Sequence, residues 1–346
     1  MQPIPRLVAL ATAVPAYPLD QEAVVERARH LFAGAVDLDR VLPVFASSGI
    51  RRRYSAVPLD WFEEPHGWPE RNRRYLATAL DLLDGATGRA LDRAGMRPSE
   101  IGAIVVVSTT GIATPSLDAL LIERMRLPRT VQRLPIFGLG CAGGVIGLAR
   151  AATIAAAMPN QAVLFLVVEL CSLTFRRDDR AKSNIVATAL FGDGAAAAVL
   201  RCRGEGPAVI ATGEHTWPQS LDIMGWEVAE DGLKPVFSRD IPRLVADKMG
   251  AAASDFLGRH GLRLADIDCF VCHPGGPKVI DALEHAFGLS PGVLEDARAV
   301  LRNYGNMSAA SLLFVLERAL ERPWERALLT ALGPGFTAGF VVLGRG

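Results

Sequence analysis

Short hydrophobic runs alternate with glycine-rich turns and longer apolar segments along the chain. In the first half, a β-branched run at 101–108 is followed by a turn that leads into an apolar segment at 138–158. Further hydrophobic runs follow at 162–168 and 194–200. Short runs bounded by turns predict strands, and the longer segment predicts a helix. The first half is therefore expected to alternate strands and helices.

The second half repeats this order of elements. A strand is predicted at 267–272, a turn at 303–306 opens an apolar helix that continues to about residue 321, and strands are predicted at 327–332 and 338–343. Alternating strands and helices indicate α/β layers. Both long helices are apolar on nearly all sides, as buried helices are. The pattern predicts a duplicated α/β fold.

Composition and charge exclude some classes of protein. Of the 346 residues, 50% are hydrophobic and 21% charged, as in an ordinary globular protein. Lys and Arg together number 37, as do Asp and Glu, so no overall field favours nucleic acid or an anionic membrane. The basic run Arg51-Arg52-Arg53 is interpreted as a solvated face.

The chain carries no segment that predicts export or stable membrane insertion. Its N-terminal apolar run is broken by Pro15 and Pro18, unlike a signal peptide. The longest uncharged stretch, 151–168, is interrupted by a turn at 158–161. We expect a cytoplasmic protein whose five cysteines are reduced thiols.

Cys141 lies where the glycine-rich turn enters the first apolar helix. A thiol at a helix N-terminus faces unpaired backbone N–H groups and the positive end of the helix dipole, which favours the thiolate. The surrounding glycines allow close approach of a substrate, and neighbouring N–H groups could stabilise an oxyanion. A small buried hydrophobic residue, the common role of a free cysteine, is the alternative.

The same segment also fits a dinucleotide-binding pattern. Gly138, Gly140 and Gly143 form G-x-G-x-x-G, and a helix, a strand and Glu169 follow. The preceding residues, 131–137, contain a proline and two polar residues, which predicts a poor buried parallel strand. An oxidoreductase that binds a dinucleotide therefore remains an alternative.

His273 ends the strand predicted at 267–272 and closes the pattern C-x-x-C-H with Cys269 and Cys272. This pattern attaches haem in exported proteins, and C-x-x-C suggests metal or redox chemistry. On a strand, however, positions 269 and 272 point to opposite faces, so the thiols cannot easily share a metal or a disulfide. The remaining alternatives are a reactive histidine at a strand end and a capping or core histidine.

Asn306 lies in the turn that opens the second apolar helix, where it could simply cap the helix. In the two similar halves, Cys141 and Asn306 occupy corresponding turns, and His273 ends the strand before the second turn. The three side chains are expected to converge on one cleft. They form a complete set for acyl transfer, because the imidazole can hold the thiolate, and the imidazole N–H and the amide can stabilise the enolate that forms when a malonyl unit decarboxylates.

Five ordered segments resemble the signatures of type III polyketide synthases, the chalcone synthase-like enzymes. They are GCAGG at 140–144, LFGDGAA at 190–196, HPGGP at 273–277, YGNMS at 304–308 and GPG at 333–335. The resemblance covers nearly the whole chain. It implies a homodimer of the thiolase-like α/β fold, with two pseudo-repeated βαβαβ halves layered as αβαβα. The halves are placed at 1–203, with the cysteine, and at 204–346, with the histidine and the asparagine.

The resemblance implies that coenzyme A thioesters enter by a narrow tunnel and that no cofactor or metal is needed. Cys141 would take the starter acyl group, and His273 and Asn306 would drive decarboxylative condensation with malonyl-CoA. Phe191 matches a gatekeeping phenylalanine between tunnel and cavity, although a core aromatic is the alternative. Thr114 matches a residue that a loop carries into the partner's cavity. Related ketoacyl synthase III enzymes share Cys-His chemistry, so a carrier-protein substrate is a further alternative.

Some positions depart from the pattern of plant members. Of the basic residues that contact the coenzyme A phosphates there, Arg40 alone has a match here, and Lys278 is expected to substitute. Pro235 stands where a second gatekeeping phenylalanine is expected. Glu169 matches a buried glutamate of the family, which removes the main support for the dinucleotide interpretation. Ser308, in the same signature as the asparagine, is expected to contact the substrate.

Within the family, the segments 221–226 and 236–242 resemble bacterial alkylresorcinol and alkylpyrone synthases. Thr109 and Cys171 are small residues at positions that resemble cavity-lining ones, which would leave room for a fatty acyl tunnel. The resemblance therefore implies a long-chain acyl-CoA starter, two or three malonyl extensions, and closure to an alkylpyrone or an alkylresorcinol.

Overall fold

Two sets of strands in one sheet carry the same topology. The computed structural model describes residues 3–32 and 42–345, within which nine strands form this sheet. In sheet order, the first half supplies β1 (Arg6–Ala13), β7 (Asp193–Arg201), β6 (Ala162–Leu170), β4 (Ile101–Val107) and β5 (Gln132–Ile136). The second half supplies β8 (Ala208–Thr216), β13 (Thr337–Gly344), β12 (Arg326–Gly333) and β11 (Cys269–Cys272).

The pairing within each set confirms the predicted duplication. From β1 or β8 outward, two antiparallel pairings are followed by a parallel one in both sets. The sets join where Arg6 pairs with Ala208. Within the main layers, the halves differ where the first has α5 (Leu117–Met125) and β5 and the described part of the second has α9 (Pro277–Ala286) and α10 (Glu295–Tyr304).

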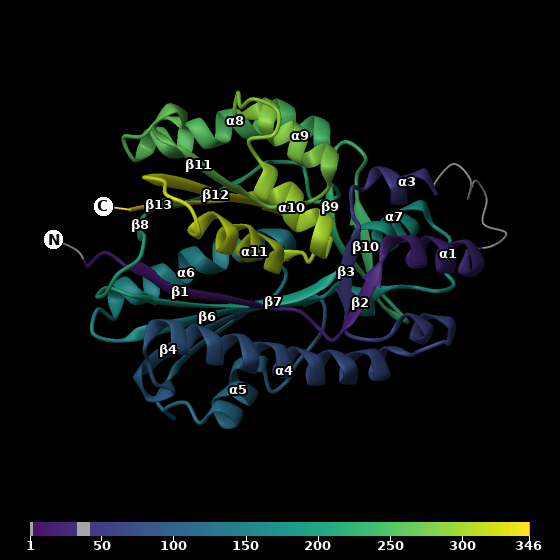
Figure 1. Ribbon diagram of the computed structural model, residues 1–346, viewed down its shortest axis with the longest axis horizontal. Coiled ribbons are helices and arrows are strands. Elements are labelled where there is room, and N and C mark those ends of the chain that lie inside the picture. The colour runs from purple at the N-terminus through teal and green to yellow at the C-terminus, as the bar shows by residue number, and fades with distance from the viewer. Residues whose placement is uncertain (1–2, 33–41, 346) are drawn as a thin grey trace.

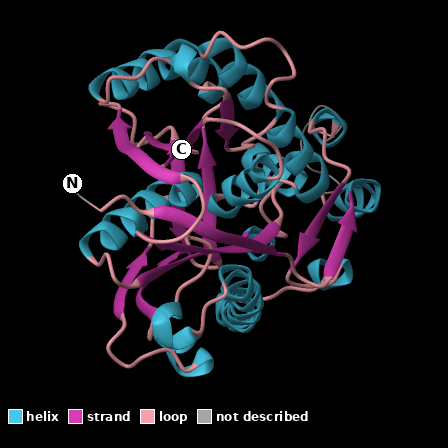
Figure 2. Ribbon diagram, turned by 60° about the vertical axis from the view of Figure 1, so that its left-hand side comes forward, coloured by secondary structure: helices cyan, strands magenta, loops and turns pink. Residues whose placement is uncertain are grey.

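Helices form the two outer layers and the central one (Figure 1). α4 (Trp68–Ala94) and α5 cover one outer face, and α8 (Ile241–Arg259) and α9 cover the other. Figure 2 shows helices between the two sets of strands as well as outside them. The central helices are α6 (Gly143–Ala157) and α11 (Ala309–Leu320). The expected αβαβα layering is confirmed.

The central helices are buried because both sides of them face strands. Ten residues of α6 and nine of α11 are buried, on every side of each helix. A β carbon on Gly144 would collide with the carbonyl oxygen of Ala309, so the two backbones touch. The stretch Gly140–Ala157 is apolar and long enough to cross a membrane, but 67% of it is buried inside the protein. Burial in the core accounts for its apolar sequence.

The segment 131–137 contains a strand that is not buried, in agreement with its proline and polar residues. β5 pairs in parallel with β4 at the edge of the sheet. Its Gln132 and Arg133 are exposed, and a proline such as Pro135 is tolerated on an edge strand, where an N–H group is not needed on the open side. The segment is therefore a strand, but not a buried one.

The remaining elements gather at one end of the layers, on the right of Figure 1. Two small ladders lie there, β2 (Tyr17–Asp20) with β3 (Arg52–Ser55), and β9 (Met224–Ala229) with β10 (Gly232–Phe237). They are accompanied by α1 (Gln21–Leu31), α3 (Pro43–Ser47) and α7 (Lys182–Leu190). These elements surround the functional site.

Candidate active site

Cys141 lies in a tight turn that runs directly into α6. The turn, Gly140–Ala142, is a single 3-10 turn. Gly140 has a φ of 48°, in the left-handed region, and a β carbon there would lie 2.7 Å from Cδ of Pro334. Glycine is needed at this position for both reasons. The turn therefore packs directly against Pro334, in the second half of the chain.

Burial opposes the ionisation of the Cys141 thiol. Desolvation raises its pKa to about 11, and a hydrogen bond with the side chain of Ser308 counteracts part of that rise. The position at a helix N-terminus favours the thiolate, but burial acts in the opposite direction. The thiol therefore needs a base that removes its proton.

His273 is a suitable base by its position and protonation state. It follows β11 and is 5% exposed, and its backbone N–H donates to the carbonyl of Thr330 at 2.9 Å. Burial lowers the pKa of His273 to about 4, so the ring is neutral near pH 7. Neither ring nitrogen has a hydrogen-bond partner within the described part of the chain. Buried polar atoms normally find partners, and here a substrate or a thiol proton can supply one.

Asn306 is held by both its backbone and its side chain. Its N–H donates to the carbonyl of Leu190 at 2.8 Å, and its carbonyl accepts from Gly192 at 3.0 Å. The side-chain Oδ1 accepts from the N–H of Ser308 at 2.8 Å, and Nδ2 donates to the carbonyl of Gly275 at 3.3 Å. The amide thus connects the start of α11 to the loop after the histidine.

The structure brings all three predicted catalytic residues to one cavity. Cys141, His273 and Asn306 line a space of about 320 Å³, here called the catalytic cavity. Ser308 also lines it, and its backbone has a φ of 47°, which is unusual for a residue other than glycine. A nucleophile, a base and an amide donor at one cavity are the groups that acyl transfer requires.

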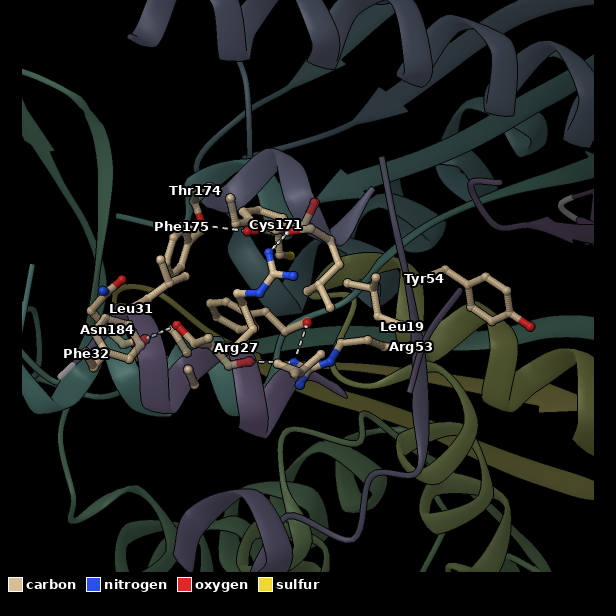
Figure 3. A pocket seen from close by; sticks show the side chains of 18 residues that line it. Leu19, Arg27, Leu31, Phe32, Arg53, Tyr54, Cys171, Thr174, Phe175 and Asn184 are labelled. Atoms are coloured by element: carbon tan, nitrogen blue, oxygen red, sulfur yellow. Dashed lines mark hydrogen bonds between the residues drawn. The ribbon is translucent and has the colours of Figure 1, made fainter. Parts of the chain in front are cut away.

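Phe191 stands between the catalytic cavity and a second, smaller one. The second cavity, of about 60 Å³, is lined mainly by apolar side chains of α1, of the region after β3 and of the segment after β6 (Figure 3). Phe191 lines both cavities. Its ring centroid lies 6.2 Å from that of Trp226 and 6.0 Å from that of Phe237. This placement fits a gate between the two spaces.

Sequence reasoning missed the aromatic wall that the β9–β10 ladder supplies. Met224, Trp226 and Phe237 all line the catalytic cavity. Pro235, assigned to a gate position, is buried opposite Trp226 in the ladder. Met224 and Trp226 are two residues apart on β9, so their side chains point to the same face of the strand. This spacing is the sequence signal that could have predicted the wall.

The other expected substrate-binding residues lie in different surroundings. Cys171 lines the second cavity, whereas Lys278 lines the catalytic cavity as an exposed side chain in the first turn of α9. Thr114 is exposed and lines neither of the two cavities within the described residues. Arg40 lies outside the described residues.

Thr109 lies beside the turn that carries the cysteine. Its hydroxyl accepts from the N–H of Gly140 at 3.2 Å, and its own N–H donates to Oε2 of Glu169 at 3.1 Å. In the described chain it lines neither the catalytic nor the second cavity. The hydrogen bonds of Thr109 with Gly140 and Glu169 support the turn that carries Cys141.

The dinucleotide interpretation does not fit the packing around the turn. Pro334 occupies the space above Gly140, and Val107 and Ala309 that above Gly143, so a pyrophosphate could not approach the start of α6. Glu169 is completely buried, which raises its pKa to about 8. It is therefore largely protonated near pH 7 and out of reach of a ribose.

The C-x-x-C-H pattern is likewise part of the core. Cys269 and Cys272 are 4% and 0% exposed and lie among buried apolar side chains. Both are free thiols, as are the other three cysteines. A haem could not reach either sulfur without opening the core.

Comparisons with known proteins agree over nearly the whole chain. The family descriptions "Chalcone and stilbene synthases, N-terminal domain" and "Chalcone and stilbene synthases, C-terminal domain" match residues 4–204 and 209–344. A 1,3,6,8-tetrahydroxynaphthalene synthase of Streptomyces peucetius subsp. caesius is 41% identical over 307 residues, which cover 86% of this chain and 81% of that protein. An alpha-pyrone synthesis polyketide synthase-like protein of Mycobacterium tuberculosis, Pks18, is 29% identical over 351 residues, 95% of this chain and 88% of that protein.

A solved structure supports the same assignment of the fold. The 1,3,6,8-tetrahydroxynaphthalene synthase from Streptomyces coelicolor A3(2), described as a bacterial type III polyketide synthase, has a TM-score of 0.94 to this chain at 30% identity. The match covers 98% of this chain and 99% of that one. The expected thiolase-like fold is confirmed.

Proposed function

The chain belongs to the chalcone and stilbene synthase family and is a type III polyketide synthase, and on that premise we propose that it condenses malonyl-CoA units with an acyl-CoA starter held on Cys141. The observation that carries the proposal is the catalytic cavity, which is lined by a half-buried thiol, by a neutral imidazole with no hydrogen-bond partner among the described residues, and by an amide that is held in place by hydrogen bonds. Acyl-CoA and malonyl-CoA are its substrates in this proposal, and no cofactor takes part.

The proposed reaction starts with transfer of the thiol proton of Cys141 to His273. The resulting thiolate attacks the thioester carbonyl of the starter, and the acyl group is transferred to Sγ as coenzyme A leaves with the proton. Burial penalises an isolated thiolate and an isolated imidazolium alike. The two charges therefore form together, as a pair in which each stabilises the other.

Condensation follows in the same cavity. Malonyl-CoA loses carbon dioxide, and the electron pair of the broken bond forms an enolate. The His273 N–H and Nδ2 of Asn306 stabilise the enolate oxygen. The enolate carbon then attacks the acyl group on Cys141, and the thiolate leaves. Repetition of loading and condensation lengthens the chain.

We propose a long-chain fatty acyl starter and an alkylpyrone or alkylresorcinol product. The support is the apolar second cavity behind Phe191, which Cys171 lines. The second cavity has a volume of about 60 Å³, and the catalytic cavity one of about 320 Å³. A long acyl chain therefore fits the second cavity only if its apolar side chains move apart. The relative named for alpha-pyrone synthesis agrees with this product class. The relatives named tetrahydroxynaphthalene synthases favour a second candidate, a fused aromatic product.

We propose that Lys278 and Arg239 contact the phosphates of coenzyme A. Both are exposed cations that line the catalytic cavity; Lys278 lies in the first turn of α9, and Arg239 lies in the loop between β10 and α8. Paired cations suit a diphosphate. They would replace the basic residues that plant members of the family carry before β3.

We also propose that the enzyme is a cytoplasmic homodimer. The edge of β5 has no strand beside it within the described chain, and Phe137 and Ile112 nearby are 60% and 46% exposed. An open edge flanked by exposed apolar side chains is suited to a second copy of the chain. Thr114 lies in the loop that follows Ile112, where it could reach the partner. The five free thiols fit a reducing compartment.

A product assay by mass spectrometry tests the function. The wild type and Cys141→Ala receive malonyl-CoA with acyl-CoAs from acetyl through palmitoyl to coumaroyl, or malonyl-CoA alone. Cysteine-dependent pyrones or resorcinols from the fatty starters are the expected result. A tetrahydroxynaphthalene formed from malonyl-CoA alone would support the second candidate function, synthesis of a fused aromatic product. No product with any coenzyme A thioester would contradict the proposal and direct the search to a carrier-protein substrate.

A further inference from the structure

Arg53 is a buried cation that the chemistry described above does not use. It lies on β3 and is 3% exposed, whereas its neighbours Arg51 and Arg52 are exposed. The interpretation of all three as a solvated face is therefore wrong for Arg53. Burial lowers the pKa of Arg53 to about 10, so it remains charged near pH 7. A buried charge is costly unless it is well paired, and its contacts indicate its role.

The guanidinium of Arg53 holds the C-terminal end of α7. Nη1 donates to the carbonyl of Thr188 at 2.6 Å and to the carbonyl of Phe191 at 3.0 Å. Nη2 donates to Oε1 of Gln21, whose Nε2 in turn donates to the carbonyl of Ala189 at 3.2 Å. The last carbonyls of a helix lack intrahelical partners and carry its negative end, so a cation suits this position. The backbone at the gate between the two cavities is thus fixed by one side chain.

The same backbone is hydrogen-bonded to the catalytic asparagine. Phe191 and Asn306 form an isolated parallel bridge, through the bonds of Leu190 and Gly192 with Asn306. Cβ of Arg53 would lie 3.3 Å from a β carbon on Gly192 and 3.4 Å from one on Gly305. Both sides of the bridge therefore pack against Arg53.

We propose that Arg53 is a positioning residue for condensation, because it holds Phe191 and Asn306 in a fixed relation. The amide then faces the enolate while the phenylalanine shapes the passage to the second cavity. Arg53 lines the second cavity (Figure 3) but not the catalytic one. It acts through these two residues and does not touch the reacting atoms. This inference rests on the proposed condensation chemistry.

The test compares Arg53→Lys with Arg52→Lys. Lysine keeps the charge but cannot present the planar fork that reaches two carbonyls and Gln21. Arg52 is the matched control, since its side chain is 53% exposed and pairs with Asp20. We expect kcat for condensation to fall about 10- to 100-fold in Arg53→Lys, the range that a misplacement near 1 Å produces. Loading of the starter on Cys141, measured by intact-protein mass spectrometry, should remain within about twofold of the wild type, because loading does not need the amide.

Several outcomes separate a positioning role from a structural one. All assays are run well below the thermal midpoint of each variant, and rates are divided by the folded fraction. Equal kcat values for the two lysine variants would overturn the inference, as would a loss of loading in proportion to condensation. If Arg53→Lys does not fold, Gln21→Met serves as the second variant, because it removes the partner of Nη2 and leaves Arg53 in place. Gln21→Met should lower kcat for condensation a few-fold while loading of the starter stays normal. An unchanged kcat in this variant would overturn the inference. A wild type without condensation activity would instead refute the proposed function.

Discussion

At the residue scale, the proposed chemistry depends on side chains whose pKa values are shifted by burial. The cysteine is harder to ionise and the histidine harder to protonate than in water, so each needs the other. Glu169, beneath the cysteine turn, is held neutral in the same way. In the proposed reaction, the Cys141 thiol and the His273 imidazole therefore become charged only when the proton moves from one to the other.

Glu169 gives a prediction about stability and pH. Burial raises its pKa from 4.5 to about 8, so the folded protein binds this proton more tightly than the unfolded chain. Its contribution to stability is present below about pH 4.5 and is lost as the pH rises through 8. Glu169→Gln should therefore raise the free energy of unfolding at pH 9, on the order of 5 kcal/mol, and change it little at pH 5. Denaturant melts at both pH values test this, with exposed Glu205→Gln as the control; a larger gain at pH 5 would contradict it.

Lys278 gives a prediction about substrate affinity. If its charge contacts coenzyme A phosphates, Lys278→Gln should raise the KM for acyl-CoA by up to about fivefold, the scale of one exposed ion pair, and leave kcat nearly unchanged. Steady-state kinetics test this, and the effect should shrink at high salt. Lys248→Gln, on the exposed face of α8, is the control. An unchanged KM would show that the lysine does not bind the phosphates.

At the scale of elements, local sequence patterns predicted the strands and helices that recur in both halves. They did not predict the features that depend on tertiary contacts. The strands around α6 and α11 were predicted because apolar runs and glycine turns are local signals. The segment of β5 was correctly predicted to make a poor buried strand, but its place at the edge of the sheet was not predicted, because the sequence does not show which strand lies there. Arg53 could not be distinguished from its exposed neighbours, because its burial depends on contacts with Gln21 and with the end of α7, which are distant in the sequence.

The convergence of the three candidate catalytic residues on one cavity was predictable, and the surroundings of that cavity were not. Cys141, His273 and Asn306 follow from turns at equivalent places in the two halves. The aromatic wall comes from a two-stranded ladder outside the main sheet, so its residues face the cavity only because of how that ladder folds over α7. Thr109 was expected on a cavity wall, but its visible contacts support the turn.

The segment after β6 gives a prediction about starter length. Cys171 is 2% exposed and lines the second cavity. Cys171→Phe should fill this cavity, so the longest accepted acyl-CoA should become shorter while an acetyl starter reacts at nearly the wild-type rate. A panel of acyl-CoAs tests this against Cys202→Phe, a partly exposed cysteine that lines neither cavity in the described chain. Overpacking also costs about 1–3 kcal/mol of stability, so melts accompany the assay. An unchanged chain-length limit would refute the placement of the acyl pocket.

At the scale of the whole molecule, the duplicated layers place one catalytic turn from each half at a common centre. The outer helices shield the two sets of strands, and within the described residues no strand pairs with the outer edge of β5 or of β11. In the proposed dimer, the outer edge of β5 contacts a second copy of the chain. The halves therefore cooperate within one protomer, and the proposed dimer adds the loop at Thr114.

The open edge gives a prediction about assembly. Phe137→Glu places a charge at the proposed interface, where an unpaired buried charge is costly. The variant should dissociate at a concentration at least about tenfold higher than the wild type, as measured by analytical ultracentrifugation. Leu221→Glu, at a position that is 83% exposed elsewhere, is the control. A wild type that sediments as a monomer would contradict the proposed dimer.

The most direct measurement follows the acyl group on Cys141 by peptide mass spectrometry. Wild type and Asn306→Ala are first incubated with palmitoyl-CoA and then with malonyl-CoA. We predict that both carry the acyl group on Cys141, and that only the wild type then extends it and releases carbon dioxide at an appreciable rate. Acylation at another residue, or equal extension by Asn306→Ala, would contradict the account of the catalytic cavity.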